Sequence, residues 1–491
     1  MKSNKFIVIN DKDNVMIALD NYPKGHILNG VTLNEDIRIG HKIALCDINK
    51  DENIIKYGCP IGRSTSDIKK GSWVHTHNVK TNLSDVVEYS YNRDNFKEVE
   101  KTERKVNVYL RANGEVGIRN ELWVIPTVGC VAGQAKRIVE VFKQNHPTLE
   151  IDGIYTFNHP YGCSQMGDDG ENTLHSLCNI ITHPNAGGVL VLGLGCENTQ
   201  ISKVKDALAS WDESRIKFLN IQDVSDEITE ANNLLDEIYE VIKHDKRSLQ
   251  GMDKIKIGLE CGGSDGLSGI TANPLIGRVS DSVIASGGTT VLTEVPEMFG
   301  AEQILLNQCD TEELYQKLVD TINDFKYYYK KHDQVIYENP SPGNKNGGIT
   351  TLEDKSLGCI RKAGSTPVID VLKMTDKVQK SGLNVIASPG NDGVATTILG
   401  MCGCQLVLFS TGRGTPFGGF IPTVKVSTNT YLYEKKPNWI DFNSGNIEAS
   451  NADETLNQFL DLIVDVINGK KTRNEENNFR EIAIFKSGVT L

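Results

Sequence analysis

The run VLVLGLGC, residues 189–196, is the stretch that decides the fold. It is too short for a buried helix, and glycines interrupt and end it, so it predicts a strand that is buried on both faces. Similar apolar runs occupy residues 122–128, 153–157, 216–221 and 255–259, with helix-like segments between most of them. Strands that alternate with helices in this way predict a parallel sheet covered by helices.

The segment 225–244, SDEITEANNLLDEIYEVIKH, is the clearest predicted helix, with Ser225 suited to the N-cap. Three more strands are predicted at residues 290–295, 385–387 and 406–410. We therefore predict an α/β fold with a Rossmann-like parallel domain at residues 104–250 and a second α/β domain at residues 251–491.

The first 80 residues have a different pattern of apolar and turn residues. Short alternating segments, such as IRIGHKIALCDI (37–48) and SWVHTH (72–77), are separated by glycine and proline turns. This pattern predicts a small, mostly β domain over residues 1–80. Residues 81–103 are polar and charged without a sustained period, so we predict a linker, or a strap across a neighbouring surface.

The composition excludes several classes of protein. The 491 residues include 52 Lys and Arg against 64 Asp and Glu, a net charge of −12, so no binding to nucleic acid or to an anionic membrane is expected. No apolar run approaches the ~20 residues that a membrane span requires, and we expect a cytoplasmic protein. The 11 cysteines are scattered and odd in number, which favours free thiols, metal ligation or catalysis over disulfides.

Four cysteines share one local position. Cys130, Cys163, Cys196 and Cys261 each lie at or just beyond the carboxyl end of a predicted strand. Ligands bind at that edge of an open parallel sheet, so several thiols could converge in one crevice and hold iron or an iron–sulfur cluster. The alternative is that each cysteine is a small buried hydrophobe; for Cys163, Cys196 and Cys261, which all lie beside glycine, we favour the metal.

In the first domain, SWVHTHN places His75 and His77 two residues apart on a predicted strand, so both imidazoles face one side. Such a pair can bind a metal or transfer a proton, or it can be a half-exposed pair at a domain contact.

Glycine-rich loops begin at residues 261, 341 and 410, with the sequences CGGSDGLSG, SPGNKNGG and STGRGTPFGG. Glycines let backbone N–H groups approach an anionic ligand, although such loops can also be simple tight turns. Arg413 could clamp a carboxylate; Lys345 could do the same, or act as a base if burial lowers its pKa. The dinucleotide and P-loop fingerprints are missing from the sequence, so neither NAD nor ATP is expected.

Long strings of this sequence resemble one known family from the first strand to the last residue. They are NVMIALD, KYGCPIGRSTSDIKKGSWVHTHN, NELWVIPTVGCV, YGCSQMGDDGENT, GLGCEN, GLECGGSDGLSGITANP, NPSPGNKNGGITTLEDKSLG, FSTGRGTPFGGFIPTVK and FREIAIFKSGVTL. Their order is that of the altronate and galactarate dehydratase family, and the WVHTHN and YGCSQMGDD strings are similar to its altronate branch.

The resemblance implies an N-terminal SAF-type, β-clip-like domain followed by an α/β dehydratase body. It also implies a hydro-lyase of hexuronate catabolism that converts D-altronate to 2-dehydro-3-deoxy-D-gluconate with ferrous iron, and Mn²⁺ as a substitute. The alternatives are dehydration of another aldonic or aldaric acid, such as galactarate, or a non-catalytic sensor of iron or sugar acids. The expected partner is a small sugar acid, with a homo-oligomer as a generic expectation.

For such a reaction we assign the iron to Cys163, Cys196 and Cys261, with Cys130 as a fourth ligand, either as a single ion or in a cluster. A second set of residues would handle protons and substrate. We assign proton transfer to His75, His77 and Lys345, the substrate carboxylate to Arg413, with Lys345 as an alternative, and further substrate contacts to Asp265, Ser264 and Asn344.

Overall fold

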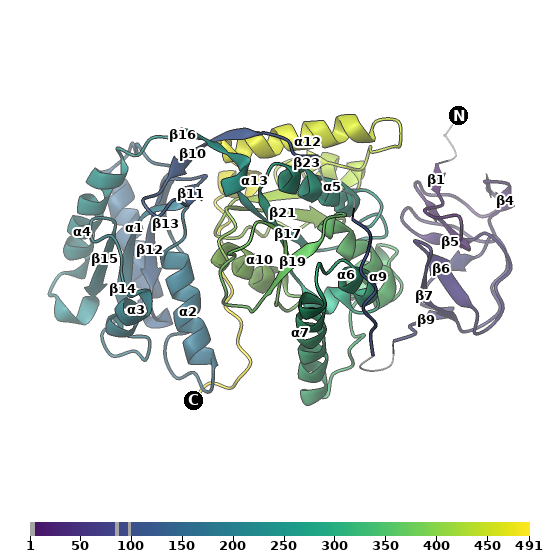
Figure 1. Cartoon of the computed structure of the whole chain (residues 1–491), viewed down its shortest axis with the longest axis horizontal. Coiled ribbons are helices and arrows are strands. Elements are labelled where there is room, and N and C mark those ends of the chain that lie inside the picture. Colours follow the sequence, from purple (N-terminus) through teal and green to yellow (C-terminus); the bar gives the residue numbers. More distant parts are fainter. Residues whose placement is uncertain (1–4, 84–87, 97–99) are drawn as a thin grey trace.

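The computed structural model describes residues 5–83, 88–96 and 100–491. Three parts lie in a row, and their order in space differs from their order in the chain (Figure 1). The C-terminal domain occupies the centre, while the N-terminal domain and the middle domain flank it on opposite sides. None of the helices in the described ranges is both long and apolar enough to cross a membrane.

The N-terminal domain is built from small antiparallel sheets, as predicted. One has the order β1-β2-β5-β8, a second has the order β6-β7-β9, and β3 pairs with β4. Their bounds are β1 Phe6–Ile7, β2 Val15–Ala18, β3 Ile27–Leu28, β4 Val31–Thr32, β5 Lys42–Ala44, β6 Asn53–Lys56, β7 Cys59–Ser64, β8 Trp73–Val74 and β9 Val79–Lys80. Met16, Leu28, Leu33 and Ile43 form part of its buried core.

The middle domain confirms the predicted alternation of strand and helix. Its parallel sheet has the order β13-β12-β14-β15, with β12 Glu121–Pro126, β13 Gly153–Thr156, β14 Ala186–Gly193 and β15 Ile216–Asn220. Its helices are α1 Ala132–Asn145, α2 Asp169–Ile181, α3 Ile201–Leu208 and α4 Glu227–Ile242. The N-cap of α4 is Asp226 and not Ser225, because the Asp226 carboxylate accepts the Thr229 N–H at 3.1 Å.

An antiparallel sheet of order β11-β10-β16 connects the middle and C-terminal domains. Its strands are β10 Lys105–Leu110, β11 Val116–Gly117 and β16 Ser248–Gly251. Near it, the buried Arg119 guanidinium binds Glu475 with Nε–Oε1 at 2.7 Å and donates to the Val466 carbonyl at 2.9 Å. A buried, bidentate pair of this kind holds the end of the chain against the start of the middle domain.

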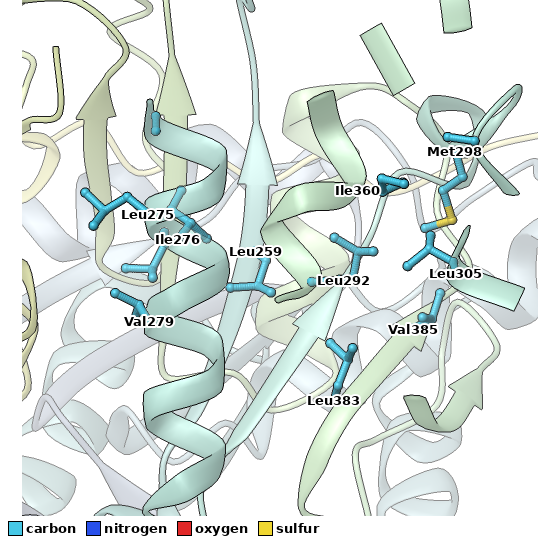
Figure 2. Close-up of a cluster of buried hydrophobic side chains, with 14 of the residues drawn as sticks. Leu259, Leu275, Ile276, Val279, Leu292, Met298, Leu305, Ile360, Leu383 and Val385 are labelled. Carbon is cyan, nitrogen blue, oxygen red and sulfur yellow. The ribbon is translucent and has the colours of Figure 1, made fainter. Parts of the chain in front are cut away.

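The C-terminal domain contains a seven-stranded parallel sheet of order β19-β20-β18-β17-β21-β22-β23. The strands are β17 Lys256–Cys261, β18 Thr289–Leu292, β19 Val368–Leu372, β20 Gly382–Ile386, β21 Leu406–Thr411, β22 Thr423–Ser427 and β23 Phe442–Asn443. The helices are α5 Ala272–Ala285, α6 Glu302–Asn307, α7 Glu312–Lys331, α8 Pro342–Asn346, α9 Leu352–Cys359, α10 Asp392–Met401, α11 Thr430–Lys435, α12 Ala452–Ile467 and α13 Arg473–Glu476. Figure 2 shows the core that fixes these elements, where Leu259 of β17 and Leu292 of β18 lie between α5 and Leu305 of α6.

Within the segment predicted as a linker or strap, residues 88–96 cross the C-terminal domain. The Tyr91 hydroxyl donates to the Cys309 carbonyl at 3.1 Å, and Arg93 pairs with Asp310 at 2.7 Å. Residues 84–87 and 97–99 lie outside the described ranges. The described part is therefore fastened to α6 and α7 along one side of the central domain.

Candidate active site

The N-terminal domain closes over the carboxyl edge of the seven-stranded sheet. The loop after β17 meets the segment after α8 through a hydrogen bond from Gly266 N to Gly347 O at 2.8 Å. A Cβ atom at Gly266 would lie 2.1 Å from Gly40 O, and one at Gly348, where φ is +102°, would lie 2.3 Å from the same atom. Glycine is therefore required where the backbones of the two domains touch.

Two buried lysines fasten this contact. Lys42 and Lys56 of the N-terminal domain bind the two oxygens of Asp354 on α9 at 2.7 Å and 2.9 Å. Burial alone would raise the pKa of Asp354, but the two ammonium groups hold it well below its usual range. Burial lowers the pKa of Lys42 to about 8 despite the pairing with Asp354. The domain contact thus depends on a fully buried ionic triad.

Three histidines surround Trp73 at the same boundary. His41 accepts the Trp73 indole N–H at Nδ1 (3.0 Å), and its Nε2 lies 3.3 Å from Asn346 O. The Nδ1 atom of His75 lies 3.2 Å from Thr350 Oγ1, and its ring stacks on Trp73 at 5.1 Å. Burial and the nearby Lys42 lower the pKa of His41 to about 4 and that of His75 to about 3. Both imidazoles are therefore neutral at neutral pH, the form that accepts a proton or binds a metal.

His77 differs from His75 in its exposure. Both residues follow β8 in a turn and do not continue the strand as predicted, because the chain reverses before β9. Their rings still lie on the side of Trp73, each at 5.1 Å from its centroid, but His75 is buried and His77 is exposed.

Beneath this boundary lies a buried thiol–carboxylate cluster. Cys261 ends β17 and Cys359 ends α9, and their sulfur atoms are 3.5 Å apart. One oxygen of Glu297 lies 3.1 Å from Cys359 Sγ and 3.5 Å from Cys261 Sγ. These three side chains place one ligand atom each within 4.8 Å of the others. Two thiols and a carboxylate in this arrangement suit a divalent transition metal.

Two lysines supply positive charge to the cluster. Lys362 Nζ lies 2.8 Å from Cys261 Sγ, and Lys355 Nζ lies 2.5 Å from Glu297 Oε1. The hydrogen bond with Cys359, together with Lys362, lowers the pKa of Cys261 to about 7 against the effect of burial. Because the thiolate is the form that binds metals, the cluster favours the reactive state of Cys261.

An open pocket of about 610 Å³ lies between the N-terminal and C-terminal domains. Four cations line it: Arg38 from the N-terminal domain, Arg413 from the loop after β21, and Lys435 and Lys436 from the end of α11. Asp20 and Asp265 also line the pocket, which leaves a surplus of positive charge. Such a pocket suits a small anion with hydroxyl groups.

Asp265 connects this pocket to the buried cluster. It also lines a narrow cavity of about 10 Å³, the space of about one water, whose other walls include Ser264, Lys355 and Cys359. The Ser264 hydroxyl is buried and has no hydrogen-bond partner in the described part of the chain. A polar ligand that entered the cavity would therefore meet an available hydroxyl beside the thiols.

The remaining predicted binding residues have structural contacts. Asp265 accepts hydrogen bonds from Thr428 Oγ1 (2.9 Å) and Asn429 Nδ2 (3.2 Å), so its carboxylate also organises the loops. Asn344 donates to Ser264 O at 2.8 Å and lies 3.4 Å from Lys355 Nζ through its Oδ1. These contacts make Asn344 a positioning residue for Ser264 and Lys355. Lys345, on α8, is only half-buried and lacks the burial that a lysine base requires.

The four predicted cysteine ligands do not meet in one place. Cys130, Cys163 and Cys196 are exposed at the carboxyl edge of the four-stranded sheet, where Thr199 N donates to Gly162 O at 3.0 Å and joins two of their loops. Cys261 belongs to the seven-stranded sheet. The expectation of one shared centre is wrong because the strands form two separate sheets. The N-terminal domain, which carries the histidines, flanks the C-terminal domain on the side opposite the middle domain (Figure 1).

The sequence analysis missed the partners of Cys261: Glu294, Glu297, Cys359, Lys355 and Lys362. One pattern could have revealed part of this set. The helix α9 carries Glu353, Asp354 and Lys355 in succession, yet every residue in it is buried. Lys355 and Cys359 are four residues apart on it and therefore share a face. Charged residues in a short segment between two apolar positions are equally compatible with a solvated turn. The sequence alone therefore did not show that the residues of α9 are buried.

The fold and the site define a class of α/β proteins in which a small N-terminal β domain closes a cationic crevice at the edge of a parallel sheet. Family models match three consecutive parts of the chain: the altronate/galactarate dehydratase SAF domain at residues 4–82, the D-galactarate dehydratase/altronate hydrolase second domain at 108–243, and the D-galactarate/altronate dehydratase C-terminal domain at 252–490. The chain belongs to the altronate/galactarate dehydratase family.

Three relatives match all or nearly all of the chain. The altronate dehydratase of Escherichia coli (strain K12) is 54% identical over 99% of this chain and 100% of its own length. The altronate dehydratase of Bacillus subtilis (strain 168) is 53% identical over 100% of both chains. The galactarate dehydratase (L-threo-forming) of E. coli K12 is 30% identical over 95% of this chain and 93% of its own.

Proposed function

We propose that this chain is a hydro-lyase that converts D-altronate to 2-dehydro-3-deoxy-D-gluconate and water. The observation that carries the proposal is full-length identity of 53–54% to two altronate dehydratases, against 30% to a galactarate dehydratase. The cationic pocket between the domains agrees with a substrate that has one carboxylate and several hydroxyls. Dehydration of galactarate is the second candidate.

The pocket residues would bind the substrate by its carboxylate. Arg413 offers a planar fork at the pocket, and its backbone N–H is held by Gly263 O at 2.8 Å. Arg38 approaches from the N-terminal domain, so a bound carboxylate joins the two domains electrostatically. Asp265 and Asn429 are placed to accept and donate hydrogen bonds to sugar hydroxyls.

Dehydration requires removal of the C2 proton, stabilisation of the negative charge that results, and protonation of the departing C3 oxygen. We assign proton acceptance to Nε2 of His75, because Nδ1 faces Thr350 and the ring is neutral. A base whose pKa is lowered is weak by itself, so the step would also need cations such as Arg413 to stabilise the charge that forms on the substrate. His77, exposed beside Trp73, is the candidate for returning the proton.

The thiol–carboxylate cluster fits the ferrous iron that the family resemblance implies. Cys261, Cys359 and Glu297 would hold it, and carboxylate oxygens nearby are buried without hydrogen-bond partners. When bound, the iron supplies Lewis-acid stabilisation to oxygens of the substrate. Because the cavity beside Cys359 has the space of about one water, substrate entry to it would need the N-terminal domain to shift. A centre at Cys130, Cys163 and Cys196 stays a separate prediction.

An anaerobic assay tests the function. The purified protein is reconstituted with ferrous iron, with and without sulfide, and 2-keto-3-deoxy acid formation is followed from D-altronate and from galactarate. We expect iron-dependent product from altronate and little from galactarate. A preference for galactarate would mean that galactarate, and not altronate, is the substrate. Iron binding without product from any sugar acid would favour a sensor.

We further propose that the enzyme works in the cytoplasm and forms a homo-oligomer. Support for a reducing compartment comes from the 11 cysteines, all of which are free thiols. Thiol titration of protein prepared without reductant, and light scattering for the assembly, test these two points.

A further inference from the structure

Three further carboxylates meet beside the thiol–carboxylate cluster. Glu260 is the penultimate residue of β17, Glu294 follows β18, and Asp392 begins α10. Each offers one oxygen within 4.8 Å of the others. Glu260 and Glu294 are completely buried, at 0% exposure. Like charges so close together in a buried place are unfavourable unless a proton or a cation is bound among them.

The oxygens of this group lack partners. Both oxygens of Glu260 and the Oε1 atom of Glu294 are buried without any hydrogen bond from the described residues. Lys362 contacts the other oxygen of Glu294: its Nζ lies 2.8 Å from Cys261 Sγ and 3.4 Å from Glu294 Oε2. A carboxylate that is buried without a partner loses its hydration and gains nothing in return. These three oxygens of Glu260 and Glu294 are therefore available to a bound cation.

The backbone is shaped to bring the carboxylates together. A Cβ atom at Gly262 would lie 2.0 Å from Asp392 Oδ2, so any other residue there would push Asp392 away. Glu294 has φ +65°, a left-handed conformation that is strained for a residue with a side chain. A strained non-glycine residue in a buried cluster is typical of a functional site.

We propose that Glu260, Glu294 and Asp392 bind a second divalent cation of the hard type, Mg²⁺ or Mn²⁺. An all-oxygen set with three carboxylates selects such ions, whereas the thiols of Cys261 and Cys359 select softer metals. Glu294 belongs to both neighbourhoods, because Oε2 lies 3.7 Å from Cys261 Sγ while Oε1 is free of hydrogen bonds. Its carboxylate therefore bridges the two sites.

The test counts Mn²⁺ on full-length protein. Metal-free, reduced protein is first loaded with ferrous iron under anaerobic conditions, and Mn²⁺ binding is then titrated by electron paramagnetic resonance with iron measured in parallel. We expect about one Mn²⁺ per chain in addition to iron. Glu260→Gln should weaken Mn²⁺ binding at least about tenfold while the iron content remains.

Glu260→Gln is informative because it keeps the shape of the side chain and breaks no hydrogen bond. Its melting temperature in the metal-free state should equal or exceed that of the wild type, which separates lost binding from lost folding. Asp392→Asn is the second variant. Asp441→Asn is the matched control, a half-buried carboxylate outside the proposed site whose oxygens accept Lys425 N (2.7 Å) and Arg473 N (2.8 Å).

Unchanged Mn²⁺ binding in both Glu260→Gln and Asp392→Asn would overturn the proposal, as would wild-type protein that binds no Mn²⁺ once iron is present. An equal loss of Mn²⁺ binding in Asp441→Asn would also overturn it, because the loss would then not depend on which carboxylate is changed. The readout does not use substrate, so the site and the proposed dehydration can fail separately.

Discussion

The middle and C-terminal domains both carry cysteines at the carboxyl ends of parallel strands, yet the two edges have different environments. Cys130, Cys163 and Cys196 are exposed on loops, whereas Cys261 is 1% exposed and faces Cys359, Glu297 and Lys362. The difference shows that strand-end position alone does not make a site. Buried charges that compensate one another do, because only they make a thiolate favourable away from water.

The largest expected effect separates the two edges directly. Cys261→Ser should reduce altronate dehydration by at least about 1,000-fold and remove most of the iron, because it deletes a proposed ligand that Lys362 holds as a thiolate. Cys196→Ser should keep both iron and activity. The measurement is kcat with iron content for the two purified variants.

The reverse result would place the iron site at the exposed edge of the four-stranded sheet. If Cys196→Ser loses iron while Cys261→Ser keeps it, the buried cluster is structural and the three exposed cysteines form the centre.

The second prediction concerns the buried charges that fasten the N-terminal domain. Asp354→Asn should lower the free energy of unfolding by about 3 kcal/mol, because Lys42 and Lys56 would each lose a buried partner. The matched control is Asp47→Asn, which breaks the Lys69–Asp47 pair of 2.9 Å whose side chains are 73% and 58% exposed. An exposed, solvent-screened pair of that kind should contribute much less than the buried one. Denaturant unfolding of both variants checks the contrast, and equal effects would contradict it.

Much of the fold could be predicted from the sequence because its strands are buried on both faces. The apolar runs at β12, β14 and β21 have no competing helical period. The strands β19 (VIDVL) and β22 (TVKVS) escaped because a charged residue interrupts each. Lys425 of β22 is nonetheless 1% exposed, since its ammonium donates to the Thr415 carbonyl at 3.1 Å.

The site was predicted less well than the fold for a physical reason. Its charged groups pair across the chain: Lys42 and Asp354 are 312 positions apart, and Lys56 and Asp354 are 298 apart. Local patterns carry no information on such pairs. Arg413 and Asp265 could be found because glycine-rich loops mark them, and both line the open pocket. Cys261 was found for the same reason, but its supposed partners came from strands of another sheet.

A smaller effect is expected at the pocket. Arg413→Gln should raise the KM for altronate by about tenfold with a smaller change in kcat, since it removes one of four cations that line the pocket. Lys203→Gln, on an exposed part of α3 in the middle domain, is the control and should leave both constants unchanged. An unchanged KM in Arg413→Gln would place the substrate carboxylate elsewhere.

The last prediction is a dependence of stability on pH at the same domain boundary. Burial, with Lys42 and Arg38 nearby, lowers the pKa of His41 from 6.5 to about 4. The unfolded chain therefore binds a proton at this residue below about pH 6.5, whereas the folded chain binds it only near pH 4. The stabilising contribution of neutral His41 is complete above pH 6.5 and is lost as the pH falls toward 4, and His75 adds a loss of the same sign.

The melting temperature of the wild type should therefore fall as the pH is lowered from 6.5 to 4. His41→Gln should flatten this profile, while the variant of exposed His77, His77→Gln, should leave it steep. A wild-type profile that is level from pH 6.5 to 4 would contradict the lowered pKa values of His41 and His75, and the buried boundary would then behave as an exposed one.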